Sequence, residues 1–150
     1  MVKPLDEKSV PALIDHVGWR LWRLARQWKA EFDVEMVRLG HGFMLEARGA
    51  VVGHLRPGGL SQSALTAAMG ISKQAVQQLV DELVAEGVVE RAPDPTDGRG
   101  RIVRLREKGI AAIADGNAVK QQIEARYGAR IGVGRLAALN EALDDLAEGQ

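Results

Sequence analysis

The chain contains no cysteine, which excludes a disulfide-stapled fold and any sensor that works by oxidising a thiol. Its formal net charge is zero, so no overall positive field draws it towards nucleic acid. This balance disfavours a nonspecific DNA-coating protein but is compatible with a local basic patch. Hydrophobic residues make up 46% of the 150 residues, which is enough to form the core of one globular domain.

No apolar run is long enough to cross a bilayer, and the first nine residues form a charged stretch that is expected to be a loose arm. The sequence therefore predicts a cytoplasmic protein without a membrane partner.

The short motifs of common enzymes and metal sites are also missing. The three histidines, His16, His41 and His54, do not have HxxxH or HExxH spacing, and no cysteine can complete a zinc set. Neither a GxxxxGK[ST] phosphate loop nor a GxSxG nucleophile elbow occurs. We expect no catalytic activity, metal or cofactor; a histidine and carboxylate site assembled between subunits stays open as an alternative.

The stretch from Leu60 to Leu105 has the pattern of a helix-turn-helix followed by a hairpin. Ser61 is an N-cap candidate for a helix that continues through residues 62–69 with Leu65, Ala68 and Met69 turned inward. Gly70 suits the left-handed exit of that helix, and Ser72 can cap a second helix directly afterwards. Two helices within this spacing predict a DNA-binding unit, although a helix hairpin without function would use the same caps.

The second helix, residues 72–86, separates into an apolar and a polar face at about 100° per residue. Its expected core side chains are Ala75, Val76, Leu79, Val80 and Leu83, and its opposite face carries Lys73, Gln74, Gln77, Gln78 and Asp81. Glutamine can bond adenine N6 and N7 together in the major groove, and lysine can reach a guanine edge or a phosphate. The face therefore indicates base reading, with a solvated helix surface as the alternative. Asp81 would repel phosphate, so we expect it one turn away from the DNA or paired to a base.

A short hairpin follows, with predicted strands at 88–92 and 101–105 joined by a turn rich in proline, aspartate and glycine. Its tip and second strand carry Arg99 and Arg101, which can enter a minor groove, where narrow A·T tracts concentrate negative potential. A merely solvated basic hairpin is the alternative. The predicted fold is thus mainly α with a small β-hairpin wing.

Residues 60–109, and above all the run GISKQAVQQLVDELVAEGVVERAPDPTDGRGRIVRLREKG, resemble the MarR family of bacterial transcription factors. The resemblance implies a homodimer with interlocked terminal helices, in which one winged domain reaches each DNA half-site. It also implies that Asp97 orients an arginine, here Arg99, that enters the minor groove.

Three positions depart from the family pattern. Gly98 stands where a further arginine is common, Thr96 stands at a place that is sometimes basic, and Arg106 replaces the threonine that often opens the next helix. Arg101 can compensate for the missing arginine.

The resemblance divides a single domain, residues 1–150, into a winged helix-turn-helix at 43–106 and dimerisation helices at 10–39 and 107–147. The apolar stripe of the first helix is expected to include Val10, Leu13, Ile14, Val17, Leu21, Leu24, Ala25, Trp28 and Phe32. Trp19 and Trp22 lie off this stripe, so a dimer partner, an effector pocket or plain exposure can account for them.

The remaining helices are predicted at 43–55, at 107–128 and, after a loop around Ile131 and Val133, at the C-terminal end of the chain. Gly116 in the middle of the helix predicted at 107–128 indicates either close packing of another helix, as in an intertwined dimer, or a kink. The last helix, with leucines every three or four residues, suits the dimer or a partner protein.

Together these features predict a dimeric, sequence-specific DNA-binding regulator, most simply a repressor on a pseudo-palindromic operator. The expected DNA contacts are Ser61, Ser63, Ser72, Lys73, Gln74, Gln77, Gln78, Asp97, Arg99 and Arg101. By resemblance a small aromatic or anionic effector relieves repression, with His16, Trp19 and Arg20 as candidate pocket residues. The alternative is a winged-helix protein-interaction module without specific DNA binding.

Overall fold

The computed structural model describes residues 10–148, so the expected loose arm at residues 1–9 lies outside the described residues. The order of elements is α1 (Val17–Arg38), η2 (Gly42–Met44), α2 (Glu46–His54), β1 (Leu60–Ser61), α3 (Gln62–Met69), α4 (Lys73–Ala85), β2 (Val89–Pro93), β3 (Arg101–Leu105), α5 (Glu107–Ile131) and α6 (Val133–Glu148). The fold is mainly helical with a three-stranded antiparallel sheet, which confirms the predicted winged helix-turn-helix class.

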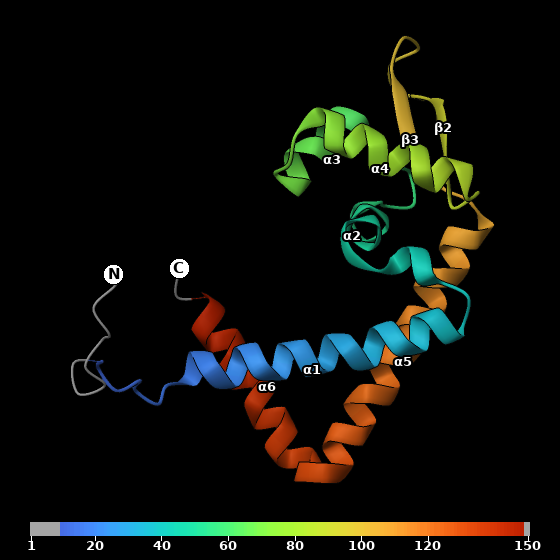
Figure 1. Cartoon of the computed structure of the whole chain (residues 1–150). Helices are drawn as coiled ribbons and strands as arrows, with labels where there is room; N and C mark the ends of the chain where they lie inside the picture. The colour runs from blue at the N-terminus through green and yellow to red at the C-terminus, as the bar shows by residue number, and fades with distance from the viewer. Residues whose placement is uncertain (1–9, 149–150) are drawn as a thin grey trace, which may run out of the picture.

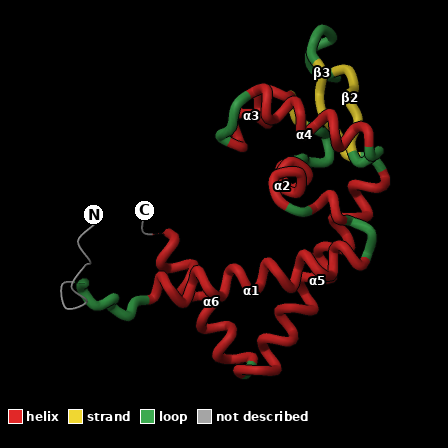
Figure 2. The backbone as a smooth tube through the Cα atoms, in the orientation of Figure 1, coloured by secondary structure: helices red, strands yellow, loops and turns green. Residues whose placement is uncertain are grey.

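The molecule has two parts (Figures 1 and 2). We call residues 42–106, from η2 to β3, the head, and the three helices α1, α5 and α6 the arm. Helix α1 crosses α5, and α5 and α6 form a V whose closed end lies on the side of α1 away from the head (Figure 1). The tip between β2 and β3 projects from the head on the side away from the arm.

The head has its own hydrophobic core. Its buried side chains come from every helix of the head, from β2 and β3, and from the start of α5: Phe43, Val51, Val52, Leu55, Leu65, Val76, Val80, Leu83, Val88, Val89, Val103 and Ala112. In the sheet, β3 lies between β1 and β2, and Val89 pairs with Leu105 while Leu60 pairs with Val103. The two-residue strand β1 was not predicted, because so short a strand has no alternating pattern to detect.

The caps predicted for the helix-turn-helix are confirmed. The Ser61 hydroxyl accepts a hydrogen bond from the Ala64 N–H at 3.1 Å, and the Ser72 hydroxyl accepts one from the Ala75 N–H at 3.1 Å. Gly70 has a φ of 63°, the left-handed exit expected at the end of α3. Ala68, predicted to face inward, is exposed, so the buried face of α3 is narrower than its apolar composition indicated.

The arm has a smaller core, formed by Phe32 and Met36 of α1 with Val119 and Ile123 of α5. Gly116 is buried beside this core, and a Cβ there would lie 3.6 Å from Phe32 and Met36. The close helix packing predicted at Gly116 is therefore present, but the neighbour is α1 of the same chain. Gly116 thus gives no support to an intertwined dimer.

The helix predicted from residue 10 begins at Val17, and that prediction was wrong for residues 10–16. Pro11 interrupts this segment, and its apolar members Val10, Leu13 and Ile14 are exposed, so no packing surface stabilises a further turn. Leu21 and Leu24, expected on the buried stripe, are also 38% exposed. The buried part of the stripe is confined to the end of α1 that crosses α5.

Two further boundaries differ from the prediction. The helix expected at 43–55 is divided into η2 and α2, because Glu46 has a φ of 56°, and a right-handed helix cannot continue through a left-handed residue. The loop expected around Ile131 and Val133 shrinks to Gly132, whose φ of 96° ends α5 and lets α6 begin at the next residue. Among residues 10–148, no helix is long and apolar enough to span a membrane.

Candidate nucleic-acid interface

Helix α4 presents a polar face to solvent, as its sequence predicted. Val76, Val80 and Leu83 are fully buried, whereas Lys73, Gln74, Gln77 and Gln78 are exposed. The Gln78 amide donates to Glu82 Oε1 at 3.3 Å. Gln74 and Gln77 make no side-chain hydrogen bond within the described part of the chain, so their amides are available to a base edge.

Asp81 on the same helix forms an ion pair with Arg91 of β2, with 2.7 Å between the Asp81 Oδ1 and Arg91 Nη2 atoms. The expectation that Asp81 pairs with a base finds no support in this geometry, since its carboxylate already has a cationic partner within the head. The sequence contained Arg91 but no spacing signal for the pair, because the contact depends on how β2 packs beside α4. The ion pair reduces the repulsion that this carboxylate would exert on phosphate.

The start of α3 carries the two serines expected to contact phosphate. The Ser61 hydroxyl caps Ala64 and lies 3.1 Å from the Ser63 hydroxyl. Ser63 is exposed, whereas Ser61 is half-buried and already used as the cap. Ser72, the corresponding cap of α4, is exposed.

The tip of the wing, residues 94–100, is held by local hydrogen bonds. Asp94 Oδ1 accepts from the Thr96 N–H at 2.8 Å and from its hydroxyl at 2.7 Å, and these bonds lower the pKa of the Asp94 carboxyl. Asp97 Oδ1 accepts from the Arg99 N–H at 3.1 Å. Asp97 therefore fixes the backbone at Arg99, whereas the family pattern implied that it orients the arginine side chain.

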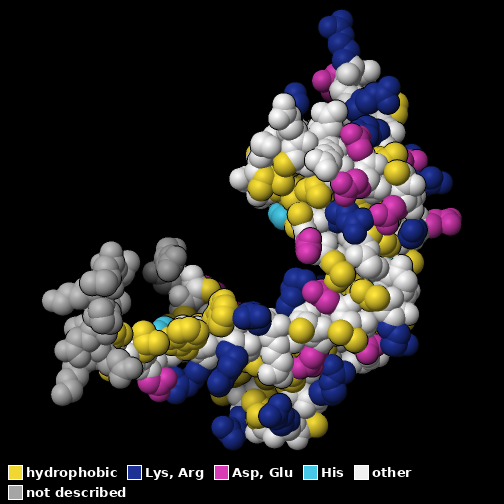
Figure 3. Space-filling view, viewed as in Figure 1, with side chains coloured by type: hydrophobic (Ala, Val, Ile, Leu, Met, Phe, Trp, Pro, Cys, Tyr) yellow, Lys and Arg dark blue, Asp and Glu magenta, His cyan; other side chains and the backbone are white. Residues whose placement is uncertain are grey.

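The arginines of the wing differ in whether an acidic side chain pairs with them. Arg104 Nε lies 2.6 Å from Glu90 Oε1 across the two strands. Arg99 and Arg101 are exposed and have no ion-pair partner among residues 10–148. The positive charge available to a nucleic acid is thus concentrated at the tip, where Figure 3 shows Lys and Arg side chains projecting from the head.

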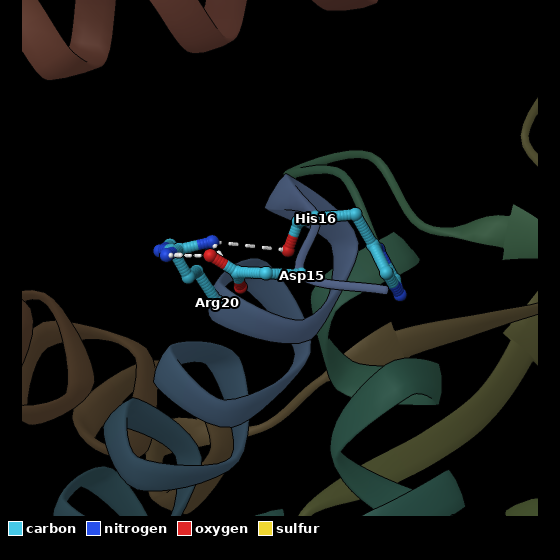
Figure 4. Close-up of polar contacts among 3 residues, drawn as sticks. All are labelled: Asp15, His16 and Arg20. Atoms are coloured by element: carbon cyan, nitrogen blue, oxygen red, sulfur yellow. Dashed lines mark hydrogen bonds and ion pairs between the residues drawn. The ribbon is translucent and has the colours of Figure 1, made fainter. Parts of the chain in front are cut away.

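The three candidate effector residues lie at the N-terminal end of α1, and all are exposed. Arg20 pairs with Asp15 through two contacts of 2.8 and 2.7 Å, and its Nη1 also donates to the His16 carbonyl at 3.3 Å. Figure 4 shows the His16 ring pointing away from Arg20 and Asp15. The His16 and Trp19 ring centroids are 6.2 Å apart. Within one chain, these residues do not enclose a ligand.

Arg20 also borders a cavity of about 410 Å³ between α1, α5 and α6, which His16 and Trp19 do not line. Its lining combines arginines with an apolar floor: Arg20, Arg23, Leu24, Gln27, Tyr127, Arg130, Ile131, Leu136 and Leu139. Sequence reasoning missed Arg23 and Arg130, because only the packing of three helices brings them together.

Glu31 borders this region and organises its polar groups. Its carboxylate accepts hydrogen bonds from Gln27 at 3.0 Å, Arg126 at 3.0 Å and the Tyr127 hydroxyl at 3.4 Å. The hydrogen bonds from Gln27 and Arg126 hold the pKa of Glu31 below its ordinary value, whereas desolvation and the Glu31 charge raise the pKa of Tyr127. No group of three metal-ligating side chains occurs in the part of the chain that the structure describes.

A family model described as the MarR family matches residues 47–100. A candidate transcriptional regulatory protein for the hcr operon of Thauera aromatica is 36% identical over 56 residues, which are 37% of this chain. The matched stretch spans 34% of that relative's length.

Several solved structures share the fold over nearly the whole chain. RV1404 from Mycobacterium tuberculosis has a TM-score of 0.76 at 18% identity, covering 93% of this chain and 98% of its own. The reduced form of MarR from E. coli has a TM-score of 0.72 at 20% identity, covering 90% and 98%. CouR from Rhodococcus jostii RHA1, bound to p-coumaroyl-CoA, has a TM-score of 0.64 at 26% identity, covering 91% and 94%.

The winged helix-turn-helix of this chain is thus similar to the MarR family over residues 47–100. Two of its departures from the MarR-family pattern have visible structural effects. Thr96 stands at a place that is sometimes basic in the family, and here it closes the turn by donating two hydrogen bonds to Asp94. Arg106 occupies the N-cap of α5, where it makes no side-chain capping bond.

Proposed function

We propose that this protein is a homodimeric regulator of transcription that reads double-stranded DNA through α4 and the wing. The observation that carries the proposal is the exposed face of α4, whose Gln74 and Gln77 amides make no hydrogen bond within residues 10–148. The same head carries a wing in which Arg99 and Arg101 have no ion-pair partner among those residues. A major groove accepts an α-helix and displays adenine edges that glutamine can bond bidentately. A MarR-family domain over this region supports the same use.

In this proposal, Lys73, Gln74 and Gln77 read base edges, with Gln78 at the margin because it is bonded to Glu82. Arg99 and Arg101 reach the flanking minor groove, where the backbone fixed by Asp97 directs the tip. Ser61, Ser63 and Ser72 stand at the starts of α3 and α4, where helix N-termini favour a phosphate anion, with Ser63 the least engaged of the three.

The dimer is part of the proposal, and the arm supplies its support. Trp19 is 49% exposed and Trp22 is 54% exposed on α1, and Leu146 is 65% exposed on α6. Figure 3 shows hydrophobic side chains gathered along this end of the arm. A surface of large apolar groups is costly in water, and a second copy would cover it. Two heads would then lie in successive major grooves about 34 Å apart on a pseudo-palindrome.

An effector of the aromatic or anionic class belongs to the same proposal. His16, Trp19 and Arg20 remain its candidates, now together with Arg23 and Arg130, which line the cavity beside Arg20. The related fold of CouR binds p-coumaroyl-CoA, an aromatic thioester that carries phosphates. An effector would shift the spacing of the heads and so compete with DNA, which makes repression with relief by ligand the simplest outcome.

The proposal assigns no catalytic group to the protein and places it in the cytoplasm. The competing function is a winged-helix module that binds protein. The amide face of α4 and the exposed arginines of the wing favour DNA, because the centre of a protein-binding face is usually enriched in aromatic and apolar side chains.

Selection of bound sites from a random DNA pool at physiological salt tests the proposal. Recovery of a two-fold symmetric motif with half-sites about one helical turn apart is the expected result. Folded protein that enriches no sequence, and whose gel shifts are weak and erased by salt, would contradict base reading and favour the protein-binding module.

A further inference from the structure

The head and the arm meet at a joint formed by η2 and α5, both of which supply side chains to the two cores. Met44 of η2 is half-buried and packs against both the head core and the arm core. Methionine is flexible and adapts to irregular contacts, so this apolar contact alone permits the head to tilt. A fixed angle between head and arm therefore requires a more directional contact at the same place.

His41 supplies such a contact. It lies in the turn between α1 and η2, it is only 8% exposed, and its Nε2 is 2.7 Å from Asp115 Oδ2 on α5. Its backbone N–H donates to the Met36 carbonyl at 2.8 Å, and its carbonyl accepts from the Met44 N–H at 2.9 Å. The ring also meets the Phe43 ring edge-on. His41 thus makes hydrogen bonds to the end of α1, to the start of the head and to the middle of α5.

The position of Asp115 makes this bond sensitive to the angle of the head. On α5, Ala112 belongs to the head core, whereas Gly116 contacts the arm core through Phe32 and Met36. Asp115 stands between these two contacts. The first turn of α5 is already fixed to the head, because Lys108 donates to the Glu86 carbonyl at 3.1 Å. The next polar contact along α5 is the bond between Asp115 and His41.

The Nδ1 atom of His41 shows that a histidine at this place lowers the stability of the fold. Nδ1 is buried and has no hydrogen-bond partner among the described residues. A buried nitrogen without a partner destabilises the folded state, and an apolar side chain in this turn would avoid that cost. The ring is therefore better explained by the bond that its Nε2 makes than by packing alone.

We propose that His41 and Asp115 are positioning residues that fix the angle of the head on the arm. This inference rests on the proposed function in one respect: in a homodimer, the angle of each head sets the distance between the two α4 helices and hence the half-site spacing that the protein accepts. Hydrogen bonds are directional, so one half-buried bond between the head and the arm can favour one angle.

Asp115→Ala removes the bond with little risk to folding, because the Asp115 side chain is 48% exposed. Asp115→Asn keeps an oxygen that can accept from Nε2–H and serves as the conservative variant. Glu124→Ala removes the same charge from α5 outside the joint, where Glu124 bonds Asn140 of α6. All three are compared with the natural chain on duplexes whose selected half-sites are separated by a series of spacings.

The natural chain, Asp115→Asn and Glu124→Ala should prefer one spacing by about tenfold or more over spacings two base pairs away, since mismatched geometry forbids simultaneous engagement. Asp115→Ala should reduce this preference to about threefold or less, while its affinity for a duplex with one half-site stays unchanged. A general loss of stability would weaken binding to every duplex alike, so the spacing preference separates positioning from a structural role.

A second measurement does not need DNA. Because the chain has no cysteine, Ala67→Cys in the head and Glu141→Cys in the arm, both at exposed positions, give a unique pair of sites for spin labels. Labelled protein diluted with unlabelled protein should show one narrow distance distribution, which Asp115→Ala broadens about twofold and Asp115→Asn does not. Unchanged spacing preference and unchanged distances in Asp115→Ala would overturn the proposal. A broadened distribution in a protein that selects no DNA would uphold the joint and refute the proposed function.

Discussion

The head buries its large apolar side chains more completely than the arm does. The head encloses twelve core residues from its helices, two strands and the start of α5, and most of them are fully buried. The arm encloses four, and it leaves Trp19, Trp22 and Leu146 about half or more exposed. The head is therefore closed within one chain, whereas the arm leaves an apolar surface that the proposed second chain would cover.

The largest expected effect is a loss of stability in the head. Leu83→Ala removes a fully buried side chain of α4 and should lower the free energy of unfolding by about 2–5 kcal/mol. The matched change in the arm, Leu139→Ala, concerns a side chain that is 37% exposed within the chain. Denaturant unfolding of both variants, at a concentration where the protein is monomeric, measures the difference. Equal losses would refute the contrast between the two parts.

A charge in the arm should break the dimer and leave the head folded. Leu24→Asp places a carboxylate on the exposed apolar side of α1, and a separated chain would lose about 100-fold or more in affinity for a two-half-site duplex. Val84→Asp, at a comparably exposed apolar position of the head, is the control and should leave the mass in solution unchanged. Light scattering and gel shift check the two expectations. A Leu24→Asp variant that remains dimeric would contradict this use of the arm.

Within the head, the glutamines of α4 should differ from one another. Gln77→Ala should cost about 1–3 kcal/mol on the selected site and relax base preference at one position. Gln78→Ala should cost less, because Glu82 already holds that amide. Binding isotherms on the selected site and on variants at each base pair measure both effects. Equal costs for the two changes would show that α4 docks at another angle.

The wing allows a similar comparison between a free and a paired arginine. Arg99→Ala should weaken binding to most sequences and reduce the slope of log affinity against log salt by about one, because one phosphate-directed charge is lost. Arg104 is neutralised by Glu90, so Arg104→Ala should leave the slope nearly unchanged. The measurement is a salt series with one duplex. If Arg99→Ala has the same salt slope as the natural chain, Arg99 does not contact the DNA.

The smallest effect concerns the polar cluster of the arm. The pKa of Glu31 lies below its ordinary value of 4.5, so its contribution to stability is present above that pH and is lost as the pH falls through the lowered value. Glu31→Gln should therefore cost about 0.5 kcal/mol at neutral pH, and the difference from the natural chain should shrink in acid. Urea unfolding at two pH values checks this sign. A difference that grows in acid would contradict it.

The sequence predicted the head far better than the arm, and the reason is physical. The signals of the helix-turn-helix are local: Ser61 and Ser72 cap the helices of their own segments, and Gly70 forms its own turn. The two faces of α4 follow directly from helical periodicity. These features depend little on distant parts of the chain, so they were predicted correctly.

The arm depends on contacts that no local pattern reports. The stripe of α1 continues unbroken through Leu21 and Leu24, yet in one chain it is covered only near Phe32 and Met36, where α5 crosses. The same limit applies to the candidate sites. The pairing of Asp81 with Arg91, the bond between His41 and Asp115, and the meeting of Arg23 with Arg130 all depend on tertiary packing.

The central claim, a head complete in one chain and an arm completed by a second, is tested most directly by the mass of the complex with DNA. Analytical ultracentrifugation of the protein with a selected two-half-site duplex should give a single species that contains two chains, and the free protein should have the mass of two chains at the same concentration. The contradicting result has two parts. The free protein would have the mass of one chain, and it would bind a two-half-site duplex one chain at a time, with no preference over a duplex that has a single half-site.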